Sequence, residues 1–289
     1  MSVVLAVLSQ ASVFAPLSMG IYISTSILGI TDLAIDGSFL MGAATFTVLS
    51  LKHCNPLLSL LCAMIAGSLM GLISGFFQLG GKIQPIIAGM LTVFLAHGAF
   101  FLLMNGPNVS LYGGLTFSNF IEQTPTWARG ISPLIISACL GLGLLKTITS
   151  RLGICLQTFG ANPLLLTQLG KNPEYFRLIG LAISNAAAGI SGALTAQQNG
   201  YADVSMGFGV TLIGIATVLI GTHLVKSLMN SEKLSIKNNL WGCVLGTFVY
   251  FFFITLLLMS GISPLYLKSV FAIVLGIGLY ATSPKAKIS

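Results

Sequence analysis

Long runs of apolar residues, separated by short polar segments, make up most of the sequence. The runs long enough to cross a membrane lie at residues 3–23, 56–79, 84–104, 131–149, 178–198, 207–225, 240–259 and 265–282. A helix needs about 20 apolar residues to span the roughly 30 Å hydrocarbon core of a bilayer. The apolar residues are continuous, whereas a transmembrane β-barrel requires alternation. The pattern predicts an all-α polytopic membrane protein with about eight or nine transmembrane helices, in a single transmembrane domain over residues 1–289.

One apolar run, at residues 39–51, is too short to cross the bilayer alone. The segment before it holds Asp32 and Asp36, beside Gly29 and Gly37. We therefore expect residues 31–37 to be a broken or re-entrant segment at membrane depth.

The composition and charge agree with a membrane protein. The chain is 55% hydrophobic and 7% charged, whereas soluble globular domains carry about 25% charged residues. The net charge of +7 is scattered over polar segments, with no basic run that alternates with aromatic residues, so we expect no nucleic-acid partner. Because Lys and Arg gather around residues 82, 146–177, 226–237 and 285–287, the positive-inside rule makes those segments cytoplasmic. The N-terminus, which we expect to be a first span rather than a cleaved signal, and the loop at 105–130 then lie outside.

A sequence pattern occurs twice, as Gly-x-x-Asp followed by an apolar, a small and an apolar residue. It is found at residues 29–35 and again at residues 200–206, where Asp203 is the acid. The charge distribution places the first copy toward the cytoplasm and the second toward the outside. Two related interruptions in opposite orientation are typical of an inverted repeat with broken helices. We predict inverted halves at about residues 1–130 and 131–289.

Asp32, Asp36 and Asp203 are candidate pathway residues. An acid near the bilayer centre costs roughly 2.5 to 3.5 kcal/mol on insertion scales, so it needs partners or water. We expect the three carboxylates to cap broken helices by accepting hydrogen bonds from free N–H groups. The alternatives are ordinary turn residues at the interface and direct contact with a substrate.

A polar segment at about residues 150–177 contains two helix starts. Asn162 followed by Pro163, with a stop at Gly170, predicts a helix of about seven residues. Asn172, before a proline and Glu174, begins the next helix in the same way.

Three consecutive leucines, Leu164, Leu165 and Leu166, lie in the first of these helices. A short exposed helix with three leucines is unfavourable unless a partner covers it. We therefore expect it to dock against another subunit; the alternative is that it lies flat on the bilayer surface.

Glycines at a spacing of four predict close contacts between helices. Gly67, Gly71 and Gly75 form a double GxxxG pattern, and Gly242 and Gly246 form another. Packing within the chain is the default interpretation, and a homodimer seam is the alternative.

Several chemistries find no support in the sequence. The three histidines and five cysteines lack metal-ligand spacing, so we expect no metal site. Lys82 and Lys171 each follow a glycine, but neither has the other glycine of a P-loop five residues before it. We therefore expect no catalytic residues and no cofactor on this chain, and any ATP to be bound by a separate subunit.

Two segments carry a resemblance to a known family. The sequence GANPLLLTQLGKNPEYFRLIGLAISNAAAGISGALTAQQNGYADVSMGFG, at residues 160–209, resembles the permease subunits of bacterial ABC importers of the branched-chain amino acid and monosaccharide type. GITDLAIDGSF, at residues 29–39, is similar to the Gly-Asp-Leu segment of the same family. The likeness keeps its order and spacing from about residue 20 to about 221, and is strongest to the branch associated with tryptophan or tyrosine uptake.

The resemblance implies a coupling helix that docks in a groove of a cytoplasmic ATPase subunit. It also implies a permease homodimer, an extracytoplasmic solute-binding protein and a location in the bacterial cytoplasmic (inner) membrane. At residues 165–168 relatives more often have small and basic residues, which leaves the docking contacts open. The residues expected at the ATPase contact are Gly160, Asn162, Pro163, Leu164, Leu165, Leu166, Gly170, Lys171, Asn172 and Glu174.

The sequence thus predicts a permease that forms a path for a small solute, most simply an aromatic or branched-chain amino acid. The alternatives are a sugar or another small solute carried by the same family, and an ion-coupled secondary transporter that uses the three acids. A third class is a structural membrane subunit without a path, which would tolerate leucine at Asp32 and Asp203.

Overall fold

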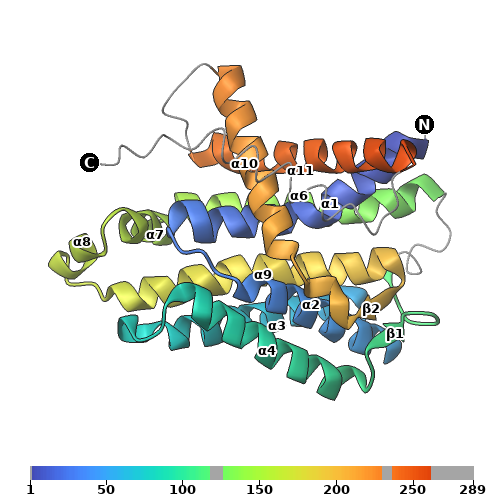
Figure 1. The fold of residues 1–289 in the computed structure, drawn as a ribbon, viewed down its shortest axis with the longest axis horizontal. Coiled ribbons are helices and arrows are strands. Elements are labelled where there is room, and N and C mark those ends of the chain that lie inside the picture. The colour runs from blue at the N-terminus through green and yellow to red at the C-terminus, as the bar shows by residue number, and fades with distance from the viewer. Residues whose placement is uncertain (1, 118–125, 230–235, 262–289) are drawn as a thin grey trace.

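The apolar runs fold into helices, most of which lie side by side along the long axis of the molecule (Figure 1). The computed structural model describes residues 2–117, 126–229 and 236–261. Its helices are α1 (Ser2–Tyr22), α2 (Ala34–Leu51), α3 (Pro56–Phe77), α4 (Pro85–Met104), α6 (Thr126–Thr149), α7 (Arg151–Ala161), α8 (Pro163–Gln168), α9 (Pro173–Asn199), α10 (Val210–Met229) and α11 (Ile236–Met259). The shorter elements are η1 (Ile23–Ile27), η2 (Leu79–Gly81), η3 (Val204–Gly207) and the antiparallel strands β1 (Asn108–Ser110) and β2 (Tyr201–Asp203).

The predicted fold class, an all-α polytopic membrane protein with broken segments, is confirmed. Within the described ranges, 7 helices are long and apolar enough to cross a membrane. The α6–α7 pair, bent by 71°, raises the number of candidate spans to 8. The ninth predicted span, at 265–282, the basic tail and residues 118–125 of the predicted outer loop lie outside the described residues. The short run at 39–51 belongs to α2, which begins at Ala34 and so reaches 18 residues.

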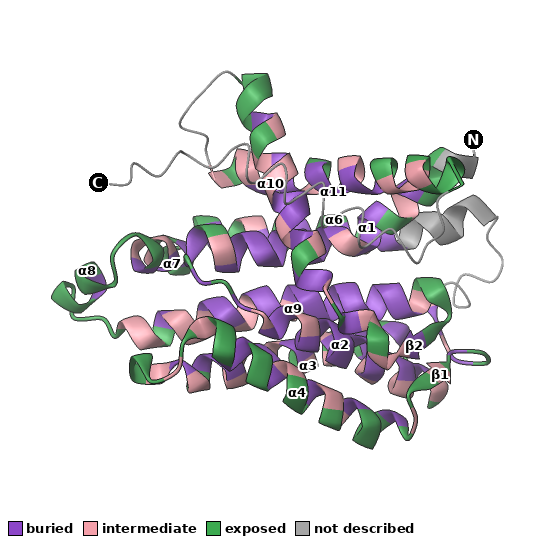
Figure 2. Cartoon of the chain, viewed as in Figure 1, coloured by how far each residue is buried: buried purple, intermediate pink, exposed green. Residues whose placement is uncertain are grey.

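Helix α9 lies in the interior of the bundle and is largely buried (Figure 2). It packs against α1, α2 and α3. Added Cβ atoms on Gly67 and Gly71 of α3 would lie 2.5 Å from backbone oxygens of α9, and one on Gly75 would lie 2.6 Å from Leu178. The glycine stripe of α3 therefore contacts α9 inside the chain, because the backbones approach too closely for larger residues.

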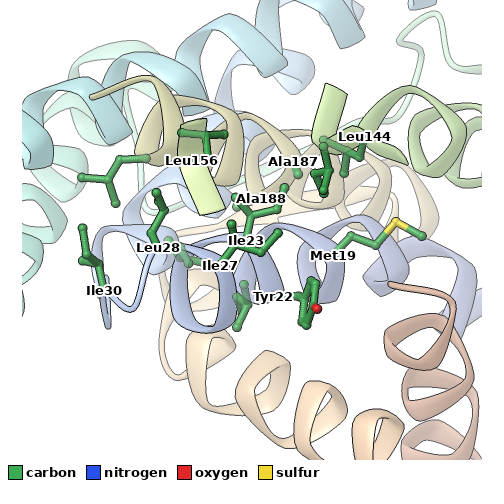
Figure 3. Close-up of a cluster of buried hydrophobic side chains, with 14 of the residues drawn as sticks. Met19, Tyr22, Ile23, Ile27, Leu28, Ile30, Leu144, Leu156, Ala187 and Ala188 are labelled. Atoms are coloured by element: carbon green, nitrogen blue, oxygen red, sulfur yellow. The ribbon is translucent and has the colours of Figure 1, made fainter. Parts of the chain in front are cut away.

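A buried apolar cluster fixes the end of the bundle that holds α8 (Figure 3). Ile27 and Leu28, just after α1, share this cluster with Leu156 of α7 and Ala188 of α9. Gly160 allows the approach of α7, because a Cβ there would lie only 1.8 Å from the carbonyl oxygen of Ile27. Helix α7 and the end of α1 are thereby packed as one unit.

The packing of α1, α2 and α3 is repeated by α9, α10 and α11. Helix α3 packs against α2 and α9, and α11 packs correspondingly against α10 and α1. Helices α1 and α9 run antiparallel, since Ser184 Oγ donates to Gly20 O at 2.8 Å and Ser191 Oγ to Val13 O at 2.7 Å. Two halves in opposite orientation would pack in this way, although α10 crosses the bundle at a steep angle (Figure 1). The predicted boundaries of the two halves stay a prediction.

Candidate functional site

Helix α8 is a short, well-capped helix at one end of the bundle (Figure 1). The side chain of Asn162 accepts from Leu164 N at 3.0 Å, and Pro163 occupies the first turn. Gly170 has φ +71°, the left-handed conformation that ends a helix most easily on glycine. The helix lies where the sequence predicts it and ends one residue earlier, at Gln168, with Leu169 as its C-cap.

The three leucines of α8 have different environments. Leu164 is 68% exposed and Leu165 is 44% exposed, so both face away from the protein. Leu166 is 1% exposed and belongs to the buried cluster with Leu156 and Phe176. Of the three leucines expected at the ATPase contact, Leu166 therefore packs inside the chain, because one side of the short helix faces the bundle.

The start of α9 is held to α7 beneath α8. Asn172 accepts from Glu174 N at 3.0 Å and so caps α9. Lys171 lies beside both helices: its Nζ donates to Cys155 Sγ at 3.2 Å and stands 5.9 Å from the centre of the Phe176 ring. Glu174 forms an ion pair with Arg177 at 3.0 Å.

Arg177 connects this region to the end of α3. Its Nη1 donates to Gln78 O at 2.7 Å, and its guanidinium lies 5.6 Å from the centre of the Phe159 ring of α7. A cleft of about 360 Å³, lined partly by Gln78, Pro163 and Arg177, opens at this end. The segment around Lys82 and the segment at 150–177, both predicted to face the cytoplasm, thus lie together.

A chain of hydrogen bonds leads from Gln78 to Asp32. Gln78 Nε2 donates to Ser74 Oγ at 3.1 Å, and Ser74 Oγ donates to Asp32 Oδ1 at 2.9 Å. Asp32 also accepts from Asn185 Nδ2 at 2.8 Å and from Ala34 N at 3.0 Å. All these side chains are buried. With Arg177 they form a polar path from the α8 end to the broken segment before α2, which we call the Arg177–Asp32 network.

Asp32 lies one residue before Leu33, the N-cap residue of α2, and holds the start of that helix. It accepts the N–H of Ala34, the first residue of α2, two residues further along the chain. It also accepts one hydrogen bond from α3 and one from α9. Three hydrogen bonds offset part of the cost of burying a carboxylate among apolar helices.

Asp36 caps a helix other than its own. Its carboxylate accepts from Gly209 N at 3.0 Å, Thr211 N at 2.7 Å and Thr211 Oγ1 at 2.7 Å, at the start of α10. An anion at a helix N-terminus also interacts favourably with the helix dipole. The first broken segment is thereby bonded to the second.

Asp203 occupies the opposite end of the bundle, beside the β1–β2 pair. It accepts from Ser205 N at 2.7 Å, from the Ser205 hydroxyl, and from Asn108 Nδ2 at 2.9 Å. The Ser205 hydroxyl is the largest cause that holds the pKa of Asp203 below its usual 3.8. Asp203 thus caps η3, whereas Asp32 holds the start of α2 from the residue before its N-cap.

The two copies of the Gly-x-x-Asp pattern share a local geometry. Gly29 and Gly200 both have left-handed backbone, with φ +69° and +75°. In each copy the acid accepts the N–H two residues later, at Ala34 and Ser205 respectively. Gly29 lies near Gly160 of α7 and Gly200 lies beside β1, so the copies sit at opposite ends of the bundle.

The sequence analysis missed the partners of the acids: Ser38, Ser74, Asn185 and Thr211. Ser38 Oγ donates to Asn185 Oδ1 at 2.6 Å and so orients the amide toward Asp32. A usable signal existed, because Asn185 is the amide nearest the centre of an otherwise small and apolar span.

Comparison with known proteins identifies the family of the chain. A family model described as "Branched-chain amino acid transport system / permease component" matches residues 3–280. The chain belongs to this permease family. It is a family of ABC-importer permeases and not of enzymes.

Relatives of the permease differ in what they carry. The permease is 37% identical over 283 residues to the uncharacterized protein RP368 of Rickettsia prowazekii, and the match covers 96% of this chain and 97% of the relative. It is 28% identical over 279 residues (95% and 90%) to the tyrosine transport system permease protein of Clostridioides difficile. It is 24% identical over 291 residues (96% and 85%) to the ribose import permease protein RbsC of Escherichia coli K12. No solved structure matches the chain.

Proposed function

We propose that this permease forms the translocation path of an ABC importer for an amino acid, aromatic or branched-chain. Two copies form the path in a bacterial cytoplasmic membrane, a cytoplasmic ATPase binds and hydrolyses ATP, and an extracytoplasmic binding protein delivers the solute. The amino-acid assignment is favoured by the 28% identity to a tyrosine permease over 95% of the chain. A sugar is the second candidate, because the likeness to a ribose permease covers 96% of the chain.

The observation that carries the proposal is the structure of α8. Leu164 and Leu165 are exposed on a helix that is capped at Asn162 and stopped at Gly170. A rigid helix with exposed leucines at the end of a membrane bundle suits insertion into a groove of a soluble subunit. We expect Gly160, Lys171, Asn172 and Glu174 to hold the helix in place from below.

The Arg177–Asp32 network supports the transmission of force from the ATPase to the helices around the solute. Movement of α8 acts on α9 through a four-residue connection, residues 169–172, and Arg177 of α9 bonds to the end of α3. From there the hydrogen bonds reach Asp32, and Asp36 four residues later holds the start of α10. All three acids accept hydrogen bonds from the chain itself, which favours an architectural role over ion coordination.

The test is a double substitution at the exposed leucines, Leu164→Glu with Leu165→Glu. The variant should insert in the membrane normally and lose co-purification with its ATPase. Leu228→Glu is the matched control, since Leu228 is 76% exposed on the predicted cytoplasmic end of α10, away from α8. Retention of the ATPase by the double variant, with the control also retaining it, would show that α8 is not the docking element.

A further inference from the structure

A histidine lies deep within the apolar helix α4. His97 is 12 residues beyond Pro85 and 7 before Met104, which places it about 18 Å and about 10 Å from the ends of the helix. The helix is strongly apolar, with a mean hydropathy of 2.2 that includes His97. Ionisable residues within membrane spans are rare and mark paths for substrates or ions.

The ring of His97 presents a hydrogen-bond acceptor without a partner. Nδ1 lies 2.8 Å from Val93 O, and because a carbonyl only accepts, Nδ1 carries the proton of the neutral ring. Nε2 is then an acceptor. It is buried and has no hydrogen-bond partner among the described residues. A buried acceptor in this state is unfavourable until a donor from water or a ligand reaches it.

Phe208 lies against His97 at the break before α10. The two ring centres are 4.8 Å apart and the ring planes are inclined by 30°. Phe208 is 52% exposed, so much of its surface stays open. Its backbone is extended, and Gly209 beside it has φ +76°.

The position of Phe208 sets it apart from lipid-facing side chains. Asp36 holds the backbone beside Phe208 by accepting a hydrogen bond from Gly209 N. The next residue, Gly37, packs against Val93 and Ala96 of α4, so the break lies beside the middle of that helix. Non-helical backbone at membrane depth is tolerated only where protein buries it or where it lines a water-filled cavity. The backbone of this break is held by α2 on one side, and Phe208 is exposed on it, where we expect water or solute.

We infer that His97 and Phe208 line the translocation path and form a binding site for a solute that carries a planar ring and a hydrogen-bond donor. The ring of the solute packs against the exposed part of the Phe208 side chain, and its donor reaches Nε2 of His97. Offset stacking and a neutral acceptor suit a phenol or an indole, whose edges carry O–H or N–H. The inference rests on the proposed function and deepens it, because it names the residues that select an aromatic amino acid.

The first test asks whether Phe208 borders water. Phe208→Cys and Leu95→Cys are compared in native membranes with a charged, hydrophilic thiol reagent, and labelling is read by mass spectrometry on the peptide that carries each substitution. Leu95 is 51% exposed, two residues from His97 in regular helix on the other flank of α4, so it matches Phe208 in exposure. We expect labelling at position 208 at least about tenfold faster than at position 95. Equal rates would overturn the inference.

The second test asks which solute the pair selects. In the complete importer with its ATPase and binding protein, Phe208→Leu keeps an apolar side chain and removes the ring, and His97→Phe keeps a ring and removes the acceptor. Each should reduce uptake of radiolabelled tyrosine about tenfold, while the ATPase stays bound.

The outcomes separate the site from the proposed function. Unchanged tyrosine uptake in both variants overturns the binding site and leaves the importer assignment intact. If the wild-type importer carries ribose and no tyrosine, the ring-binding claim and the amino-acid assignment both fail. Loss of ATPase co-purification from Leu164→Glu with Leu165→Glu is measured separately and tests docking alone.

Discussion

Replacing Asp32 should destabilise the permease far more than replacing Asp203, although the two acids occupy the same position of the repeated pattern. Asp32→Ala leaves Ala34 N and Ser74 Oγ without their buried acceptor, while Asn185 Nδ2 keeps its second bond, to Leu181 O. Each stranded buried donor costs about 1–3 kcal/mol, and removal of the carboxylate recovers part of its desolvation cost. We therefore expect a loss of about 2–4 kcal/mol.

Asp203→Ala is the matched comparison. Its partners, Ser205 N and Asn108 Nδ2, lie at an exposed end of the bundle where water replaces the carboxylate. Loss of an exposed cap costs about 0.5–1 kcal/mol, at the lower end of the range for helix caps.

The assay is thermal unfolding in detergent, followed with a thiol-reactive dye; exposure of the buried Cys243 adds to the signal of cysteines that are accessible in the fold, such as Cys139. Each kcal/mol shifts the midpoint of a chain of this size by about 2 °C. Asp32→Ala should lower the midpoint by roughly 4–8 °C and Asp203→Ala by no more than about 2 °C. Equal shifts would refute the reasoning that burial, and not the shared pattern, decides the cost.

Three further outcomes are expected. Gly67→Val should lower the free energy of unfolding by about 1–3 kcal/mol through overpacking against α9. Gly98→Ala should be neutral or stabilising by up to about 1 kcal/mol, because nothing lies within 4 Å of its added Cβ. Thermal midpoints that move together in the two variants would contradict this. Arg177→Ala should leave the ATPase bound but reduce the solute carried per ATP about tenfold. The reduction corresponds to the loss of roughly 1.4 kcal/mol from the charged hydrogen bond to Gln78 O. An unchanged ratio of solute to ATP would exclude the Arg177–Asp32 network as the route by which force is transmitted. Because the pKa of Asp203 is lowered on folding, its stabilisation is complete above the ordinary value of 3.8 and is lost as pH falls through the lower folded value. The protection of the Ser205 amide against hydrogen exchange, relative to an unfolded amide at the same pH, should therefore fall only below pH 3.8. A loss of protection at about pH 6 would count against the cap.

The fold could be read from the sequence because the bilayer requires long apolar runs. Span positions follow from hydropathy, and the short helix α8 follows from strong local signals at Asn162, Pro163 and Gly170. These signals act within a few residues, so they need no knowledge of tertiary contacts.

The partners of the acids could not be read from the sequence, because they come from distant parts of the chain. Asn185 is 153 residues from Asp32, and Thr211 is 175 residues from Asp36. The sequence predicts that Asp36 caps a broken helix, but only the fold shows that the helix is α10. The burial of Leu166 could not be read from the sequence either, because it depends on Leu156 and Phe176, which local helix signals do not report.

The central claim is that ATP hydrolysis on a docked partner drives solute through this permease, and uptake into vesicles tests it most directly. The complete importer is reconstituted with a fixed internal supply of ATP, and tyrosine uptake is measured with and without a proton uncoupler. The account predicts ATP-dependent uptake that the uncoupler leaves unchanged and that Leu164→Glu with Leu165→Glu abolishes. Uptake that collapses with the uncoupler while ATP remains would contradict the account and identify an ion-coupled transporter.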